Sequence, residues 1–142
     1  MILALDPGRD KVGLALVDEE GQQVKLKMLV REEFAEEVFE ILKNRDVEAV
    51  VLGNGTYSRE LMEELKKQLK DLSQENLKLG LVDEKGSTSE ARKLYREDNP
   101  GSQLKKLLLQ VMDWKPAVPL DHYAALVLAK RYLKDGFLER NS

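Results

Sequence analysis

The side chains best suited to chemistry in this sequence are carboxylates at three separated points. Asp6 follows a short apolar run at the N-terminus, Glu84 (with Asp83 beside it) follows another, and Asp121 begins a helical apolar pattern. An acid at the end of a buried strand needs a partner or a cation. Carboxylate oxygens are the ligands that Mg²⁺ and Mn²⁺ prefer, and two such ions stabilise both oxygens of a phosphodiester displacement. Brought together, these acids would form a metal site for phosphoryl chemistry.

Each carboxylate also has a purely structural interpretation. Asp6 can simply begin a tight turn, Glu84 can end a strand, and Asp121 can complement a helix dipole, which is worth about 0.3–1 kcal/mol. Gly13 lies opposite Asp6 across the predicted hairpin, and a glycine inside a strand often marks the close approach of a ligand or another backbone. Gly13 therefore favours a site, although the spacing alone leaves both interpretations open.

The hydrophobic pattern predicts the elements that would position these acids. Residues 2–17 read as a β-hairpin and 24–29 as a third, half-exposed strand, so the chain opens as an antiparallel meander. Apolar strands at 47–52 and 77–82 each follow a helix, which indicates right-handed crossovers and parallel pairing. The predicted helices are 31–44, 58–72, 91–96 (capped by a Ser87–Glu90 capping box), 104–111 and 120–133, with a proline-bounded connector at 114–119.

This order predicts one α/β domain over residues 1–142, with a mixed five-stranded sheet and helices on both faces. The RNase H-like fold is the architecture that fits the order best. In such a sheet the first, fourth and fifth strands lie side by side, so Asp6 and Glu84 emerge at the same edge. The final helix can bring Asp121 to the same place.

Composition excludes several classes of protein. The chain has no cysteine, which rules out disulfides, zinc–thiolate sites and cysteine nucleophiles. No apolar run is long enough to span a bilayer, so we expect a soluble cytoplasmic protein without membrane contact. The net charge of −3 argues against a dedicated, strongly basic nucleic-acid binder. Positive charge is concentrated in the second half, however, which predicts that this half would meet a polyanion.

Further candidates surround the three carboxylates. The loop of Gly53, Asn54, Gly55 and Thr56 joins a strand to a helix N-terminus, a geometry that suits a phosphate and also an ordinary turn. Asp83 and His122 are auxiliary candidates; His122 could move a proton near the metals or be a half-buried histidine. The predicted nucleic-acid contacts, which could equally be a solvated face, are Arg9, Lys11, Lys85, Arg92 and Arg96.

Three separated motifs resemble the YqgF/RuvX family along nearly the whole chain. The first has the family's Asp-x-Gly turn and small-residue second strand, the second is similar to its Asp-Glu-Arg-x-(Ser/Thr)-Thr-x-Glu-Ala segment, and the third to its Asp-x-x-Ala-Ala helix. The chain departs from the family pattern at Lys85 (usually Arg), at His122, and at Gly53–Thr56, where a Gly-Leu-Pro stretch is usual. The matching segments are Leu5–Gly8 with Lys11–Ala15, Asp83–Arg92, and Leu120–Ala125.

The family is RNase H-like and comprises Holliday-junction resolvases, or nucleases that trim pre-16S ribosomal RNA. The resemblance implies that Asp6, Glu84 and Asp121 are catalytic ligands of Mg²⁺ or Mn²⁺, and that the partner is a DNA junction or structured RNA. A junction resolvase needs two active sites, which implies a homodimer. The alternatives are a non-catalytic RNase H-like binding module, favoured by the acidic charge and altered loop, and, less favoured, a small ATP binder.

Overall fold

The structure of the protein is a computed structural model that describes residues 1–72, 76–98 and 121–138. Its centre is a five-stranded sheet in the order β3-β2-β1-β4-β5. The first three strands pair antiparallel, and β4 and β5 continue the sheet parallel to β1. The strands are β1 (Ile2–Pro7), β2 (Lys11–Val17), β3 (Gln23–Val30), β4 (Ala49–Gly53) and β5 (Lys78–Val82). The helices are α1 (Phe34–Asn44), α2 (Ser58–Leu72), α3 (Ser87–Asp98) and α5 (Asp121–Asp135).

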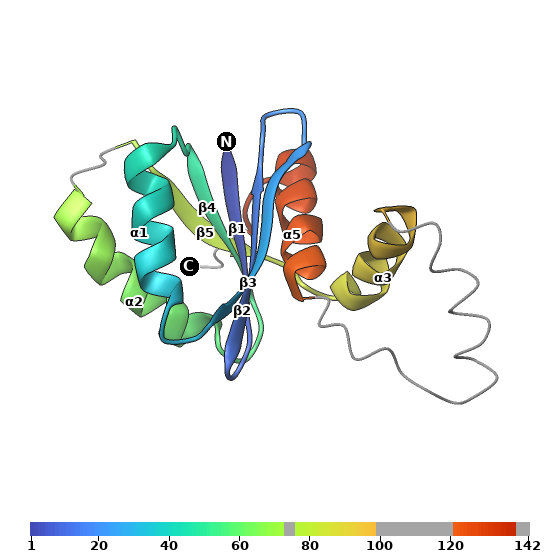
Figure 1. The fold of residues 1–142 in the computed structure, drawn as a ribbon, viewed down its shortest axis with the longest axis horizontal. Helices are drawn as coiled ribbons and strands as arrows, with labels where there is room; N and C mark the ends of the chain where they lie inside the picture. The colour runs from blue at the N-terminus through green and yellow to red at the C-terminus, as the bar shows by residue number, and fades with distance from the viewer. Residues whose placement is uncertain (73–75, 99–120, 139–142) are drawn as a thin grey trace.

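Helices cover both faces of the sheet. Figure 1 shows α1 and α2 on one side and α5 on the other, with α3 packed beyond α5. The predicted α/β architecture, the meander and the parallel strands are therefore confirmed. The helix predicted at 104–111 and the connector at 114–119 lie outside the described residues.

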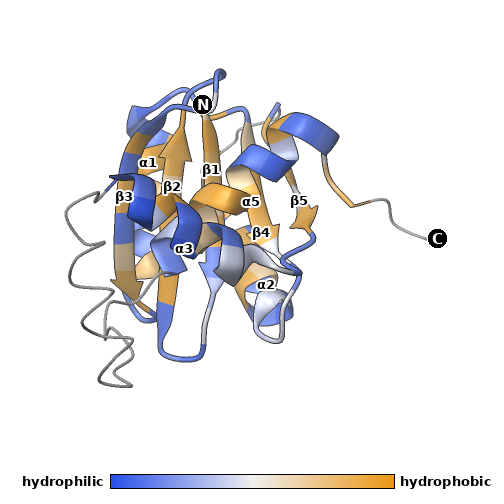
Figure 2. Cartoon of the chain, turned by 90° about the vertical axis from the view of Figure 1, so that its right-hand side faces the viewer, coloured by the Kyte–Doolittle hydropathy of each residue, from blue (hydrophilic) through white to orange (hydrophobic). Residues whose placement is uncertain are grey.

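The two faces of the sheet differ in side-chain size because the strands alternate. Leu3 and Leu5 of β1 point toward α1 and α2, where they pack with Phe34 in a core of large side chains. Ile2 and Ala4 point toward α5, and the neighbouring strands present further small residues there. Alanines on both the sheet and the inner face of α5 let this helix lie close to the strands. In Figure 2 the strands are largely hydrophobic, whereas α3 is largely hydrophilic.

Two predicted helix starts were wrong. Helix α1 begins at Phe34 rather than at residue 31, because the Arg31 main-chain N–H donates to Asp10 O at 2.9 Å and residues 31–33 form a turn. Helix α3 begins at Ser87, four residues earlier than predicted. Ser87 is thus inside the helix rather than its N-cap. The predicted capping box is not formed, since the Ser87 main-chain N–H donates to Glu84 O and the Glu90 main-chain N–H donates to Gly86 O.

Candidate active site

Asp6 lies near the end of β1, on the side of the sheet that α5 covers, and it pairs with Gly13 of β2. Its side chain is half-buried. The pKa of Asp6 is raised from 3.8 to about 7, mainly by burial, then by the negative charges of Asp121 and Glu84 and by a hydrogen bond to Glu84. The structure therefore brings together the three carboxylates that the sequence singled out. Without a cation, Asp6 is protonated in about half of the molecules at neutral pH.

Glu84 is held against two glycines of the β4–α2 loop. A Cβ at Gly53 would lie 2.7 Å from Glu84 Oε2, and a Cβ at Gly55 would overlap the same carboxylate. Asn54, between them, donates its main-chain N–H to Val82 O at 3.1 Å and accepts the Glu84 N–H at its Oδ1, also at 3.1 Å. The loop thus fixes the main chain of Glu84 and leaves room for its side chain. We call Gly53–Gly55 the glycine cradle.

The glycine cradle forms most of the phosphate loop that the sequence predicted at Gly53, Asn54, Gly55 and Thr56. The space directly over its two glycines is taken by a carboxylate. Close approach of Glu84 is thus a sufficient reason for glycine at both positions. Phosphate binding by this loop stays a prediction.

Asp121 is the first residue of α5, and the main chain there lies directly over Gly13. A Cβ at Gly13 would overlap the Asp121 carbonyl group and would lie 2.8 Å from the His122 main-chain nitrogen. Because Gly13 is also the partner of Asp6 in the hairpin, one glycine places the start of α5 beside Asp6. The close approach predicted at Gly13 is confirmed, and it is made by another backbone.

His122 is half-buried beside this site. Burial lowers the pKa of the imidazole below 6.5, against the opposing effect of Asp121, so the ring is neutral at pH 7. Its Nδ1 is buried and has no hydrogen-bond partner among the described residues. The ring centroid lies 4.7 Å from that of Tyr123. The auxiliary role predicted for His122, like that for Asp83, stays a prediction.

The three carboxylates have the chemistry of a divalent-cation site. Their mutual repulsion contributes to the raised pKa of Asp6, and a bound cation would remove that cost. Within residues 1–72, 76–98 and 121–138, no three acidic or imidazole groups already surround one point as metal ligands. A hydrogen bond joins Asp6 and Glu84 instead. The oxygen donors fit Mg²⁺ or Mn²⁺, which would replace the proton held by this pair.

The predicted nucleic-acid contacts are all exposed, but they fall in different places. One pair lies at the β1–β2 turn that follows Asp6, and one residue follows Glu84 directly. Two lie one turn apart on α3, where Arg96 Nε donates to the Arg92 carbonyl oxygen at 3.3 Å. Contact with nucleic acid stays a prediction for the whole set, which is Arg9, Lys11, Lys85, Arg92 and Arg96.

Arg131 of α5 was missed by the sequence analysis. Its guanidinium donates to the Asp83 carbonyl oxygen at 2.7 Å and pairs with the Glu90 carboxylate at 2.8 Å. It therefore ties α5 to the end of β5 and to the first turn of α3, on either side of Glu84 in the chain. The only sequence signal was a cation following the apolar run of this helix.

Gly55→Ala tests the glycine cradle. We expect the added methyl group to displace the flexible Glu84 carboxylate, so the stabilising effect of Mn²⁺ on thermal unfolding should largely disappear. The metal-free free energy of unfolding should change by less than about 1 kcal/mol, because the side chain can move and the glycine's φ is not positive. Thr56→Ala, one residue along and exposed, should keep the full Mn²⁺ response. An unchanged Mn²⁺ response in Gly55→Ala would contradict this role for the cradle.

Comparisons with known proteins identify the family of the chain and support its fold. The family model described as RuvX: Holliday junction resolvase matches residues 1–135. A Thermus thermophilus RuvC structure matches with a TM-score of 0.52 and 17% identity, over 95% of this chain and 96% of that chain, which supports the RNase H-like fold. A search of curated proteins finds no match. The chain therefore belongs to the RuvX family of Holliday junction resolvases.

Proposed function

We propose that this protein is a metal-dependent endonuclease that hydrolyses phosphodiester bonds in structured nucleic acid, either junction DNA or precursor ribosomal RNA. The observation that carries the proposal is the meeting of Asp6, Glu84 and Asp121, which leaves the pKa of Asp6 at about 7 through burial and the two neighbouring charges. Three carboxylates from separate elements serve no packing purpose at a half-buried site. They are a natural donor set for cations that act on phosphate.

Each part of the site has a definite task in this proposal. Asp6, Glu84 and Asp121 would hold Mg²⁺ or Mn²⁺, and the bound ions would stabilise the charge that develops on the attacking and leaving oxygens. The glycine cradle keeps the Glu84 carboxylate pointed at Asp6. Lys85, exposed and next in the chain, is placed to contact a phosphate of the substrate.

The cellular setting belongs to the same proposal. Within the described residues, no helix is long and apolar enough to cross a membrane. We infer action in the cytoplasm, where both candidate substrates occur. A homodimer would present two active sites to the two strands of a junction.

A thermal melt titrated with Mn²⁺ tests the metal site first. We expect Mn²⁺ to raise the melting temperature of the wild-type protein at pH 8, because only the folded chain assembles the three carboxylates. Stabilisation at 100 times the dissociation constant amounts to about 2.7 kcal/mol. The melt should be accompanied by cleavage assays on a labelled four-way junction and on a structured precursor RNA. The absence of both stabilisation and cleavage in millimolar Mn²⁺ would contradict the proposal.

A non-catalytic binding module remains the second candidate. It is favoured by the net charge of −3 and by the lack of a preformed metal cluster in the described part of the chain. Such a module would bind junction DNA or RNA equally well with and without Mn²⁺, and it would leave the nucleic acid intact. The same two assays therefore separate the candidates.

A further inference from the structure

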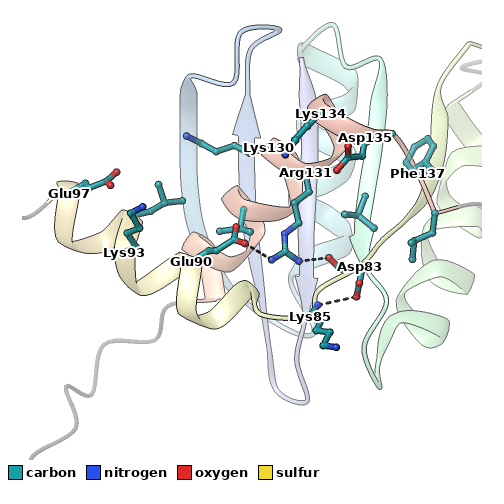
Figure 3. A pocket seen from close by; sticks show the side chains of 15 residues that line it. Asp83, Lys85, Glu90, Lys93, Glu97, Lys130, Arg131, Lys134, Asp135 and Phe137 are labelled. Atoms are coloured by element: carbon teal, nitrogen blue, oxygen red, sulfur yellow. Dashed lines mark hydrogen bonds and ion pairs between the residues drawn. The ribbon is translucent and has the colours of Figure 1, made fainter.

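A cleft of about 950 Å³ lies between α3, the end of α5 and the segment after α5 (Figure 3). Leu94 of α3, Val127 of α5 and Phe137 give it apolar walls. Asp83 and Lys85, the two neighbours of Glu84 in the chain, line its inner end. The cleft therefore starts beside the carboxylate site and runs away from it along the two helices.

Besides Lys85 at the inner end, three lysines from opposite sides of the cleft have no ion-pair partner in the part of the chain that the structure describes. Lys93 comes from α3, and Lys130 and Lys134 lie one turn apart on α5 (Figure 3). Arg131, deeper in the cleft, is neutralised by Glu90. The positive charge available to a ligand is thus that of these three lysines and of Lys85.

Four acidic side chains also line the cleft, and one of them, Glu90, is paired with Arg131. Asp83, at the inner end, accepts the Lys85 main-chain N–H at 3.0 Å. Glu97 and Asp135 belong to the last turns of α3 and α5. The part of the cleft between α3 and α5 therefore presents lysine ammonium groups next to apolar walls. A ligand that fits has repeated negative charges and flat apolar groups.

We propose that this cleft binds a single nucleic-acid strand of the substrate, with phosphates on Lys93, Lys130 and Lys134 and bases against the apolar walls. The proposal rests on the nuclease function for the position of the cleft beside Glu84. Its volume of about 950 Å³ is in the range of sites for small ligands, which suits a few nucleotides of one strand. Apolar and aromatic walls with flanking cations are typical of sequence-tolerant single-strand binding.

The test measures binding without cleavage, in the Asp6→Asn protein. Fluorescence anisotropy with labelled dT12 and U12 is recorded from 50 to 200 mM salt, with and without the added pair Lys130→Gln and Lys134→Gln. The control pair is Lys66→Gln and Lys70→Gln, which has the same spacing on exposed positions of α2, on the opposite face of the sheet. All four lysines are exposed helical residues, and glutamine has a similar helix propensity.

We expect the α5 pair to weaken binding about tenfold at low salt and to lower the slope of log K against log salt by about 1.4, since each single-strand phosphate contact contributes about 0.7. The α2 pair should change neither value. Equal behaviour of the two pairs, or tighter binding of a dT12·dA12 duplex than of dT12, would overturn the proposal. Cleavage by the wild-type protein is scored separately, so loss of the nuclease proposal and loss of the cleft proposal give different results.

Discussion

Asp6→Asn is expected to abolish metal-dependent cleavage while producing a metal-free protein that is more stable than wild type at pH 8. Asp6 is hydrogen-bonded to Glu84 and is repelled by the negative charge of Asp121, so it is the central member of the donor set. An amide keeps the shape but removes the charge that attracts a cation. We expect the cleavage rate to fall by about 10³-fold or more, since the metal ions provide several kcal/mol of transition-state stabilisation.

The gain in stability follows from the raised pKa of Asp6. Its value is 3.8 in the unfolded chain and about 7 in the folded one, mainly because of burial and then because of the neighbouring charges. Between these values the folded state binds more protons, so the wild-type free energy of unfolding falls as pH rises from about 4 to 7. The loss amounts to roughly 2–4 kcal/mol, and it is complete above the folded pKa. The amide of the Asp6→Asn protein does not titrate. The free energy of unfolding of the variant therefore does not fall with pH in this way.

Urea unfolding of both proteins in EDTA, at pH 4 and pH 8, measures this difference. The wild-type protein should lose stability relative to Asp6→Asn between the two pH values, and excess Mn²⁺ at pH 8 should restore it in the wild type only. Asp10→Asn is the matched control, because Asp10 is an exposed acid in the same hairpin. The Asp10→Asn protein should cleave at the wild-type rate, and its free energy of unfolding should change with pH as that of the wild type does. Full cleavage by Asp6→Asn would show that the catalytic site lies elsewhere.

The positions of the three carboxylates could be predicted because they depend on local patterns. Alternation in β1 and the apolar run of β5 place Asp6 and Glu84 near the ends of strands, and the order of elements makes those strands neighbours of β4. The start of α5 is likewise a local helix signal. Register within the sheet then brings Asp6 and Glu84 together, and the close approach of α5 to Gly13 adds Asp121.

The contacts that hold the site in shape could not be predicted, because each joins segments far apart in the chain. Asn54 reaches the Glu84 main chain across 30 residues, and Arg131 reaches the Asp83 carbonyl across 48. Nothing in the local sequence distinguishes Asn54 from an ordinary loop residue. The reason for glycine at positions 53 and 55 is likewise visible only in the structure, which puts the Glu84 carboxylate over both of them.

Gly13→Ala should damage the site through the main chain rather than through a lost ligand. Its Cβ would overlap the Asp121 carbonyl group and approach the His122 nitrogen at 2.8 Å, and neither backbone atom can rotate away. The start of α5 must therefore move away from β2. We expect a loss of roughly 3 kcal/mol in the free energy of unfolding, at the upper end of overpacking costs. We also expect cleavage to fall by about 100-fold, since a displacement of about 1 Å has that effect in a positioned site.

Gly21→Ala separates these two effects. Gly21 has a φ of +85° in the β2–β3 turn, at the end of the hairpin away from Asp6. Alanine there strains the backbone and should lower stability by about 1 kcal/mol without moving any carboxylate. With both variants assayed well below their melting temperatures, only Gly13→Ala should lose cleavage and the Mn²⁺ response. Equal activity of the two would mean that the contact between Gly13 and the Asp121 main chain supports the fold alone, and that the geometry of the carboxylates tolerates a shift of α5.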